Sequence, residues 1–311
     1  MKTAIKAAVI GAGHVGSHVA SELIRQGLCR ELVLVDTDRE KAKGHAADMM
    51  DTVAYLSHHV NAYAGWYDQV GDADIVVMCA AIAYFTDQDR LNELKPTLEV
   101  ADDVIKGLKG CGFSGIIVSI SNPCDIVAQY LQARTGLTVI GTGTALDSAR
   151  FRVRLSRALN IAAPSIQGYC MGEHGDSQVP MLSTVTAGGL SFSQLRDMYP
   201  QVDFNQICLD TVTAGWDIVQ GKGNTEFGIA AAAAKLIRAI LYDEQAILPC
   251  SVLLNGTYEA PRIYASVPCI VGKEGAVPLG ELPLTHDERQ ALSQSFQVLL
   301  SHLPAALREE K

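Results

Sequence analysis

The chain has 311 residues and a mass of 33.3 kDa; 48% of its residues are hydrophobic and 19% are charged. This length and composition predict a globular protein of one or two domains with a substantial core, and they exclude a disordered chain. The formal net charge of −9, with no long basic run, disfavours nucleic acid and anionic membrane surfaces as partners.

The N-terminus and the cysteines favour a cytoplasmic protein. The first residues lead directly into a short apolar run, without the apolar segment or cleavage site of a signal peptide. No uninterrupted apolar stretch reaches the roughly 18 residues that a membrane span needs. The eight cysteines are scattered and form no C-x-x-C motif, so we interpret them as reduced core thiols and expect no disulfide framework and no metal site.

An apolar strand is expected over residues 6–10, and the sequence Gly-Ala-Gly-His-Val-Gly follows it directly, before a helical apolar pattern. Gly11 permits a tight turn, Gly13 lets a pyrophosphate approach the backbone, and Gly16 allows helix and strand to pack closely. The N-terminus of the helix offers free N–H groups to the phosphate. We therefore predict a dinucleotide site formed by these three glycines and the adjoining Val15.

The next expected strand, residues 31–35, ends at Asp36, 20 residues after Gly16. A carboxylate at this place accepts hydrogen bonds from the adenosine ribose hydroxyls and repels a 2′-phosphate, which favours NAD over NADP. Asp36 is also compatible with a plain role as the cap of a helix over residues 37–55. Arg39 nearby leaves room for a more relaxed choice of cofactor.

Three further strands, at residues 74–79, 115–120 and 138–140, are continuously apolar, as strands covered on both faces are. With the first two strands they predict an α/β fold: a Rossmann-type doubly wound parallel sheet, followed by an α+β substrate domain.

The alternation of strands and helices gives way after residue 143 to helices and strands of antiparallel character. We therefore place an NAD-binding domain at residues 1–143 and a catalytic domain at residues 144–311. One helix, residues 145–159, crosses into the second part.

Loops at the carboxyl ends of parallel strands are where ligands bind in such a sheet. Behind the third strand, Tyr84 and Phe85 stand in a polar loop, and a lid that closes on an apolar substrate group explains them better than chance exposure. The fourth strand ends in Ser-Asn-Pro. A cis bond before Pro123 would aim the Asn122 side chain inward, although Asn-Pro is also ordinary turn chemistry.

A third motif, Gly-Glu-His-Gly-Asp, contains His174, whose neighbours do not suit helical core packing. Asp147 and Arg150 lie 27 and 24 residues before it, at i and i+3 of one expected helix, so one turn can serve both the histidine and a substrate. We interpret the three as a proton donor, the carboxylate that holds it and an arginine that grips the substrate. A buried carboxylate favours imidazolium and fixes its tautomer, and a guanidinium binds a planar carboxylate bidentately. An isolated histidine is more often structural than catalytic. The other motifs favour the catalytic interpretation of His174.

With these motifs in place, the chain resembles the L-lactate/malate dehydrogenase family along nearly its whole length. The matching pieces occur in the family's order and at near-family spacing: residues 11–16, Val35-Asp36, Asp89-Arg90-Leu91, Ser121-Asn122-Pro123, residues 146–152 and residues 172–176.

The resemblance implies a role for each matching position. His174 would be the acid/base histidine, Asp147 its partner carboxylate and Arg150 the clamp on the substrate carboxylate. Arg90 would be the loop arginine that polarises the reacting carbonyl, and Asn122 the pocket asparagine that hydrogen-bonds it.

Two further positions match the lining of the substrate and nicotinamide pockets, Thr225 on the substrate side and Ile229 on the cofactor side. Asn122 is counted with the cofactor contacts as well. The family implies a homodimer or homotetramer that works on a small 2-oxo or 2-hydroxy acid.

The loop before Arg90 departs from the patterns of the lactate and malate branches. With no gap assumed, Tyr84 stands where these branches carry the glutamine or arginine that sets specificity. Tyr84 cannot pair with a second carboxylate, and Asp87 and Asp89 would repel one, so malate is disfavoured. The chain is most similar to the L-2-hydroxyisocaproate dehydrogenase branch, which implies a larger apolar 2-oxo acid as substrate, with turnover of pyruvate still possible.

Many bacterial lactate dehydrogenases bind fructose 1,6-bisphosphate through an arginine and a histidine. Arg152 retains the first, but Gln167 replaces the second, so we expect no such activation. Three other readings stay open: a malate dehydrogenase, an NAD- and metal-dependent glycosidase on a related fold, and a non-catalytic NAD-binding module. The last would not need His174, Asp147 and both arginines together.

Overall fold

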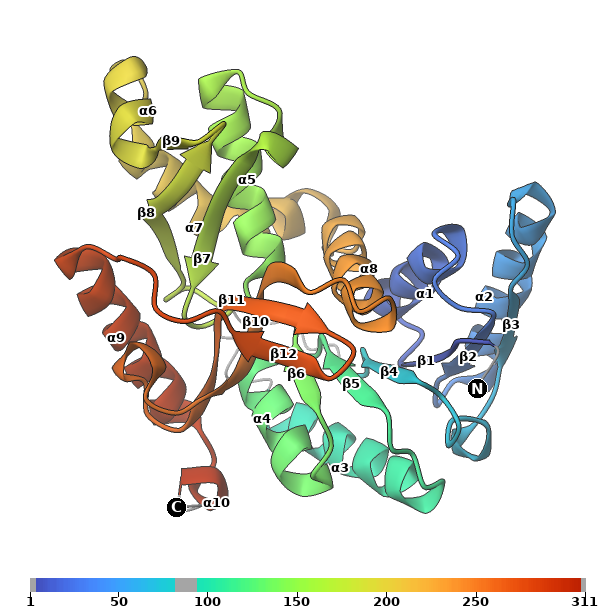
Figure 1. Ribbon diagram of the computed structural model, residues 1–311. Coiled ribbons are helices and arrows are strands. Elements are labelled where there is room, and N and C mark those ends of the chain that lie inside the picture. Colours follow the sequence, from blue (N-terminus) through green and yellow to red (C-terminus); the bar gives the residue numbers. More distant parts are fainter. Residues whose placement is uncertain (1–3, 82–93, 309–311) are drawn as a thin grey trace.

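The computed structural model describes residues 4–81 and 94–308. Its centre is a nine-stranded sheet in the order β12-β11-β10-β6-β5-β4-β1-β2-β3 (Figure 1). The six strands from β3 to β6 are all parallel, and their order is that of a doubly wound dinucleotide-binding sheet. They are β1 (Lys6–Ile10), β2 (Glu31–Val35), β3 (Asn61–Ala64), β4 (Ile75–Met78), β5 (Ile116–Ser119) and β6 (Val139–Gly141).

Helices cover both faces of this sheet, which is why its strands are apolar throughout. In β1, Ala7 and Val9 pack in one core cluster, whereas Ala8 and Ile10 pack in another, because successive side chains of a strand point to opposite faces. The first face is covered by α1 (His14–Arg25), α2 (Arg39–Thr52) and α8 (Phe227–Leu241), and the second by α3 (Leu94–Gly110) and α4 (Cys124–Thr135) (Figure 1).

Three antiparallel strands from the C-terminal half extend the same sheet. Ser251 of β10 pairs with Gly141 of β6, so the sheet is continuous across the expected boundary near residue 143. These strands are β10 (Ala246–Leu254), β11 (Ile263–Gly272) and β12 (Gly275–Pro278).

A second, three-stranded antiparallel sheet and its helices form the other layer of the C-terminal half, with a core cluster of their own around Phe151 and Leu155. The strands are β7 (Ile166–Met171), β8 (Val179–Ala187) and β9 (Leu190–Ser191). The helices are α5 (Ala145–Leu159), α6 (Phe192–Met198) and α7 (Phe204–Lys222), and the chain closes with α9 (His286–His302) and α10 (Ala305–Arg308). Short 3-10 turns lie at Val53–Tyr55, Tyr67–Gln69, Ala163–Ser165 and Thr257–Glu259.

The predicted fold class is confirmed. The strands expected at residues 6–10 and 31–35 and the helix expected at 145–159 have the predicted bounds, whereas β3 carried no prediction because only one of its four residues is buried. Within residues 4–81 and 94–308, every helix is too short or too polar to cross a lipid bilayer.

Candidate active site

His174, Asp147 and Arg150 come together as predicted. Asp147 is almost fully buried, and its two carboxylate oxygens take different partners: Oδ1 accepts from Arg150 Nη1 at 2.8 Å, and Oδ2 accepts from His174 Nδ1 at 2.7 Å. Because a carboxylate flanked by an arginine only accepts, Nδ1 of His174 must carry the proton. Nε2 is then the ring atom that can exchange a proton with a ligand.

The two halves of this triad come from different elements. Asp147 and Arg150 lie on the first turns of α5, one turn apart, so both side chains reach the same place. His174 lies in the loop after β7. In this loop Gly172 has a φ of +92°, and its amide and carbonyl groups pair with the backbone of Ser266 of β11. A side chain at Gly172 would meet Ser295 Oγ at 2.4 Å, so glycine is required at this turn.

A second buried carboxylate supports His174 from its backbone. Asp125 Oδ2 accepts the His174 backbone N–H at 2.8 Å, and only 2% of Asp125 is exposed. Burial raises the pKa of Asp125 to about 6, against the opposing effects of the neighbouring Ser251 hydroxyl and of the hydrogen bond from the His174 amide. No motif in the sequence pointed to Asp125; an acidic residue in the first turn behind Asn-Pro was the available signal.

Asn122 lies at the carboxyl end of β5, in the turn that leads into α4. The Asn122–Pro123 peptide bond is cis, as the sequence suggested. Its Oδ1 atom is buried and has no hydrogen-bond partner among the described residues, and the same holds for Arg150 Nε. Buried polar atoms of this kind are expected where a polar ligand completes the site.

The glycine loop between β1 and α1 has the shape that a dinucleotide needs. A Cβ atom at Gly11, where φ is +96°, would lie 2.6 Å from the Ala80 nitrogen, and one at Gly16 would lie 1.8 Å from the Gly11 oxygen. Gly13, by contrast, has open space within 4 Å of such an atom, and as N-cap of α1 it supplies no side-chain cap. The open space at Gly13 leaves room for a phosphate to approach the N-terminus of α1, which is where this fold class binds one. Val15, half-buried in the first turn of α1, packs against the core beneath this loop.

Asp36 stands at the end of β2 and is not the cap of α2. That task belongs to Asp38, whose Oδ1 accepts the Lys41 amide at 3.0 Å. Asp36 Oδ2 instead accepts the Ala12 amide of the glycine loop at 2.7 Å, and Oδ1 accepts the Asp38 amide at 2.9 Å. The alternative of a helix cap at Asp36 is thereby wrong, and the carboxylate is held beside the loop with lone pairs left for ribose hydroxyls.

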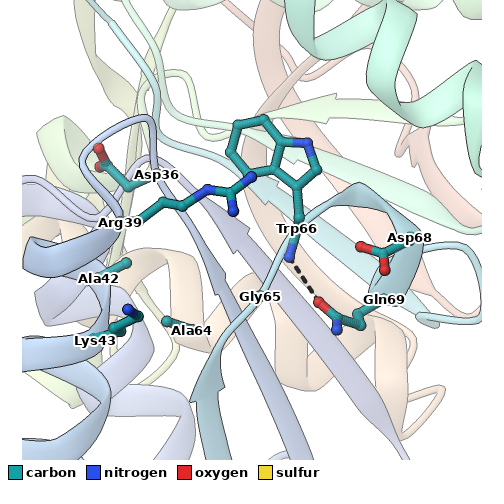
Figure 2. Close-up of a pocket in the computed structure, with 9 residues that line it drawn as sticks. All are labelled: Asp36, Arg39, Ala42, Lys43, Ala64, Gly65, Trp66, Asp68 and Gln69. Atoms are coloured by element: carbon teal, nitrogen blue, oxygen red, sulfur yellow. Dashed lines mark hydrogen bonds between the residues drawn. The ribbon is translucent and has the colours of Figure 1, made fainter.

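A hollow of about 470 Å³ opens next to Asp36, between α2 and the end of β3. Figure 2 shows Arg39 and Trp66 side by side in it, with the Arg39 guanidinium 4.9 Å from the centre of the Trp66 ring. The sequence did not point to Trp66, because a single tryptophan behind a weak strand carries no motif. The hollow is lined by Asp36, Arg39, Ala42, Lys43, Ala64, Gly65, Trp66, Asp68 and Gln69.

Thr225 and Ile229 lie at the start of α8, where three elements meet. A Cβ atom at Gly228 would touch Leu146 of α5, directly beside Asp147, and the Phe227 ring stacks edge-on against His18 of α1 at 5.1 Å. Thr225 is half-buried and Ile229 is buried. The N-terminal part of α8 thus contacts both α1, the helix of the glycine loop, and α5, the helix that carries Asp147.

Two predicted site residues, Tyr84 and Arg90, lie outside the described residues. Among the described residues, no three histidine, cysteine, aspartate or glutamate side chains gather in an arrangement that would hold a metal ion.

Comparison with known proteins agrees with this geometry. The model of the lactate/malate dehydrogenase NAD binding domain matches residues 5–139, and that of the family's alpha/beta C-terminal domain matches residues 144–310. The chain is 38% identical over 305 residues to an L-lactate dehydrogenase of Fusobacterium nucleatum, covering 96% of each chain.

Two solved structures have nearly the same fold. The ligand-bound minor L-lactate dehydrogenase of Enterococcus mundtii superposes with a TM-score of 0.94 at 34% identity, covering 97% of this chain and 98% of that one. The lactate dehydrogenase of Cryptosporidium parvum, complexed with lactic acid and NAD, gives a TM-score of 0.93 at 28% identity and covers all of both chains. The chain belongs to the lactate/malate dehydrogenase family and is an NAD-dependent oxidoreductase of 2-hydroxy acids.

Proposed function

We propose that this protein is an L-2-hydroxyacid dehydrogenase whose preferred substrate carries an apolar side chain, of the 2-oxoisocaproate type, with pyruvate as a poorer substrate. The observation that carries the chemistry is the buried Asp147 between His174 and Arg150. The preference for an apolar group rests on Tyr84 in the sequence, where a lactate or malate enzyme would carry glutamine or arginine.

In this proposal each side chain acts on a stated atom of the substrate. Bound NADH supplies the hydride that arrives at C2 of the 2-oxo acid. Arg150 holds the substrate carboxylate with its guanidinium, whose Nε is free of partners among the described residues. As charge develops on the carbonyl oxygen, His174 gives it the proton on Nε2, and Asp147 stabilises the ring while it is an imidazolium.

The remaining residues orient the substrate and exclude water. The Asn122 side chain, whose Oδ1 atom is buried, would hydrogen-bond the reacting oxygen or the cofactor. Arg90 would stabilise charge on the carbonyl oxygen, and Tyr84 would contact the apolar group of the substrate. Thr225 and Ile229 line the substrate and nicotinamide sides.

The cofactor would run from the triad along the glycine loop to Asp36. Gly11, Gly13, Val15 and Gly16 would hold the pyrophosphate, and Asp36 would accept the ribose hydroxyls. We assign the hollow beyond Asp36 to the adenosine end, because the Trp66 face and the Arg39 guanidinium offer stacking surfaces for a base.

The division into residues 1–143 and 144–311 is part of the proposal, as the units that bind cofactor and substrate. So are a homodimeric or homotetrameric assembly and a cytoplasmic location, the latter because the eight cysteines are all free thiols.

A substrate panel tests the proposal. NADH consumption is followed at saturating cofactor with 2-oxoisocaproate, phenylpyruvate, pyruvate and oxaloacetate, with and without a chelator, and His174→Gln is the matched control. We expect the highest kcat/KM for a large apolar 2-oxo acid, no effect of the chelator, and a ~10²–10⁴-fold loss in the control. A panel led by pyruvate or oxaloacetate would refute the assigned preference, and chelator-sensitive turnover of a glycoside would refute the reaction itself.

A further inference from the structure

Asp125 is a buried carboxylate that the reaction, as described so far, does not use. It lies in the first turn of α4, two residues behind Pro123, and its Oδ2 atom accepts the backbone N–H of His174 at 2.8 Å. Its Oδ1 atom lies 3.5 Å from Ser266 Oγ of β11. One helical turn thus connects the Asn122 turn, the His174 loop and the C-terminal strands.

The charges around Asp125 single out His174 as its cationic neighbour. Cys124 and Glu173 also lie near Asp125, but the thiol is neutral and the carboxylate is negative. Among the described residues, no lysine or arginine forms an ion pair with Asp125. A positive charge on His174 acts on Asp125 favourably. By reciprocity, an ionised Asp125 favours the imidazolium form of His174.

The identity of the residue needs an explanation. An asparagine would accept the same backbone hydrogen bond through its side-chain oxygen, without the desolvation cost of a buried carboxylate. The helix N-terminus repays a part of that cost, since an acidic group is favoured there. A negative charge at this position therefore needs a further reason. The His174 ring, which is cationic when it acts as the acid, provides that reason.

We propose that Asp125 is a positioning residue for the reaction, which fixes the His174 backbone and, through its negative charge, favours the protonated ring that donates to the substrate. This inference rests on the proposed role of His174 as the acid. Asp147 would act on Nδ1 of the ring and Asp125 through the backbone N–H, so that two buried carboxylates bind one histidine. Asp125 touches neither substrate nor cofactor in this arrangement.

The test separates charge from position with two variants. Asp125→Asn keeps an acceptor and removes the charge, whereas Asp125→Ala removes both. Asp176→Asn is the matched control, because it neutralises an exposed carboxylate two residues beyond His174, where solvent screens the charge. The readout is the pH profile of kcat/KM for reduction of the best 2-oxo acid in the panel.

For Asp125→Asn we expect the high-pH limb of the profile, where reduction fails for lack of a protonated donor, to move to lower pH by ~0.3–1 unit. Below that limb its turnover should stay within about tenfold of the wild type. Asp125→Ala should lose ~10–100-fold in kcat at every pH, because the histidine backbone is no longer fixed. Asp176→Asn should leave the limb where it is.

A high-pH limb of Asp125→Asn that coincides with the wild type would overturn the role of the charge, and wild-type turnover in Asp125→Ala would overturn the role in positioning. A readout without turnover keeps this test apart from the proposed function. The pH dependence of ring acylation by diethyl pyrocarbonate, which attacks the neutral imidazole, is measured with His174→Gln as the baseline. Its midpoint should fall in Asp125→Asn even if the substrate panel assigns another acid, and an unchanged midpoint would count against the inference.

Discussion

At the scale of single residues, Asp147 has two roles, and each of them uses a different carboxylate oxygen. Its Oδ2 atom fixes the ring of His174, and its Oδ1 atom fixes the guanidinium of Arg150. The proton donor and the substrate clamp are therefore held in one geometry by a single buried group. Removing the carboxylate would leave Arg150, itself only 11% exposed, as a buried cation without its partner, which is costly.

Arg150→Lys tests whether the clamp needs the planar fork. Lysine keeps the charge but cannot bind a carboxylate bidentately, so we expect kcat/KM for the 2-oxo acid to fall by ~10²-fold or more while the Kd for NADH stays the same. Steady-state kinetics and a fluorescence titration with NADH measure the two quantities. Equal losses in both would show that Arg150 acts on the fold and not on the substrate.

The raised pKa of Asp125 also predicts how the free energy of unfolding depends on pH. Burial raises the pKa of Asp125 from its ordinary 3.8 to about 6, so the folded state holds a proton that the unfolded chain releases. The stability that this proton contributes is present below about pH 4 and is lost as the pH rises to about 6. Asparagine has no such dependence.

The free energy of unfolding of Asp125→Asn should therefore rise relative to that of the wild type between pH 4.5 and pH 7.5, by on the order of 1–3 kcal/mol. Urea titrations of both proteins at the two pH values give this difference, and the other ionisable groups cancel in it. A relative change of the opposite sign would mean that Asp125 is better paired in the folded chain than its burial suggests.

At the scale of elements, the turn from β1 into α1 shows how glycines with different surroundings serve one site. Gly16 is required by the protein itself, because any side chain would collide with the Gly11 carbonyl. Gly13 is surrounded by open space and is required only if a ligand approaches. Sequence alone assigns these different reasons by analogy, whereas the structure measures them.

The pair Gly13→Ala and Gly16→Ala turns this difference into a measurement. Gly16→Ala should lower the free energy of unfolding by ~1–3 kcal/mol or more, because the new methyl group meets backbone. Gly13→Ala should stay within about 1 kcal/mol of the wild type, as expected for an N-cap change, yet weaken NADH binding. Thermal melts and NADH titrations check both. If Gly13→Ala binds NADH normally, the pyrophosphate does not approach this loop.

At the scale of the whole molecule, the two halves of the chain share one sheet. β10 pairs with β6, and just behind β6 the Thr144 amide is bound by Ser266 Oγ at 3.0 Å, while Thr144 Oγ1 donates to the Cys170 carbonyl at 2.6 Å. The expected boundary at residue 143 is thus a packed seam, without a linker. Separation of the halves would leave backbone groups of β6 and β10 without hydrogen-bond partners. We therefore expect the two halves to unfold together.

Thiol labelling in increasing urea tests this coupling. Cys29 lies in the N-terminal half and Cys250 in β10, and both are buried. Burial raises the pKa of Cys29 to about 12, whereas a hydrogen bond with Cys269, together with burial, raises that of Cys250 well above its ordinary value. In the native protein both should react far more slowly than a free thiol, because the thiolate is the reactive form. We expect the two to lose protection at the same urea concentration. Earlier labelling of one of them would show that the halves unfold separately.

The sequence alone determined the fold class, the cofactor loop and the members of the triad. Continuous apolar strands, the spacing of Gly11, Gly13 and Gly16, and the i, i+3 placement of Asp147 and Arg150 are local patterns, and local backbone geometry turns them directly into structure. Even the bounds of α5 followed from such a pattern.

Which groups meet across long distances in the chain depends on how the elements pack. Asp125 reaches His174 over 49 residues, and Asp38 rather than Asp36 caps α2, which frees Asp36 for the loop at Ala12. Neither contact has a sequence signature, because side chains brought together by packing of α4, β7 and β11 share no spacing along the chain. The same packing joined β10 to β6 and so made one sheet out of two predicted domains.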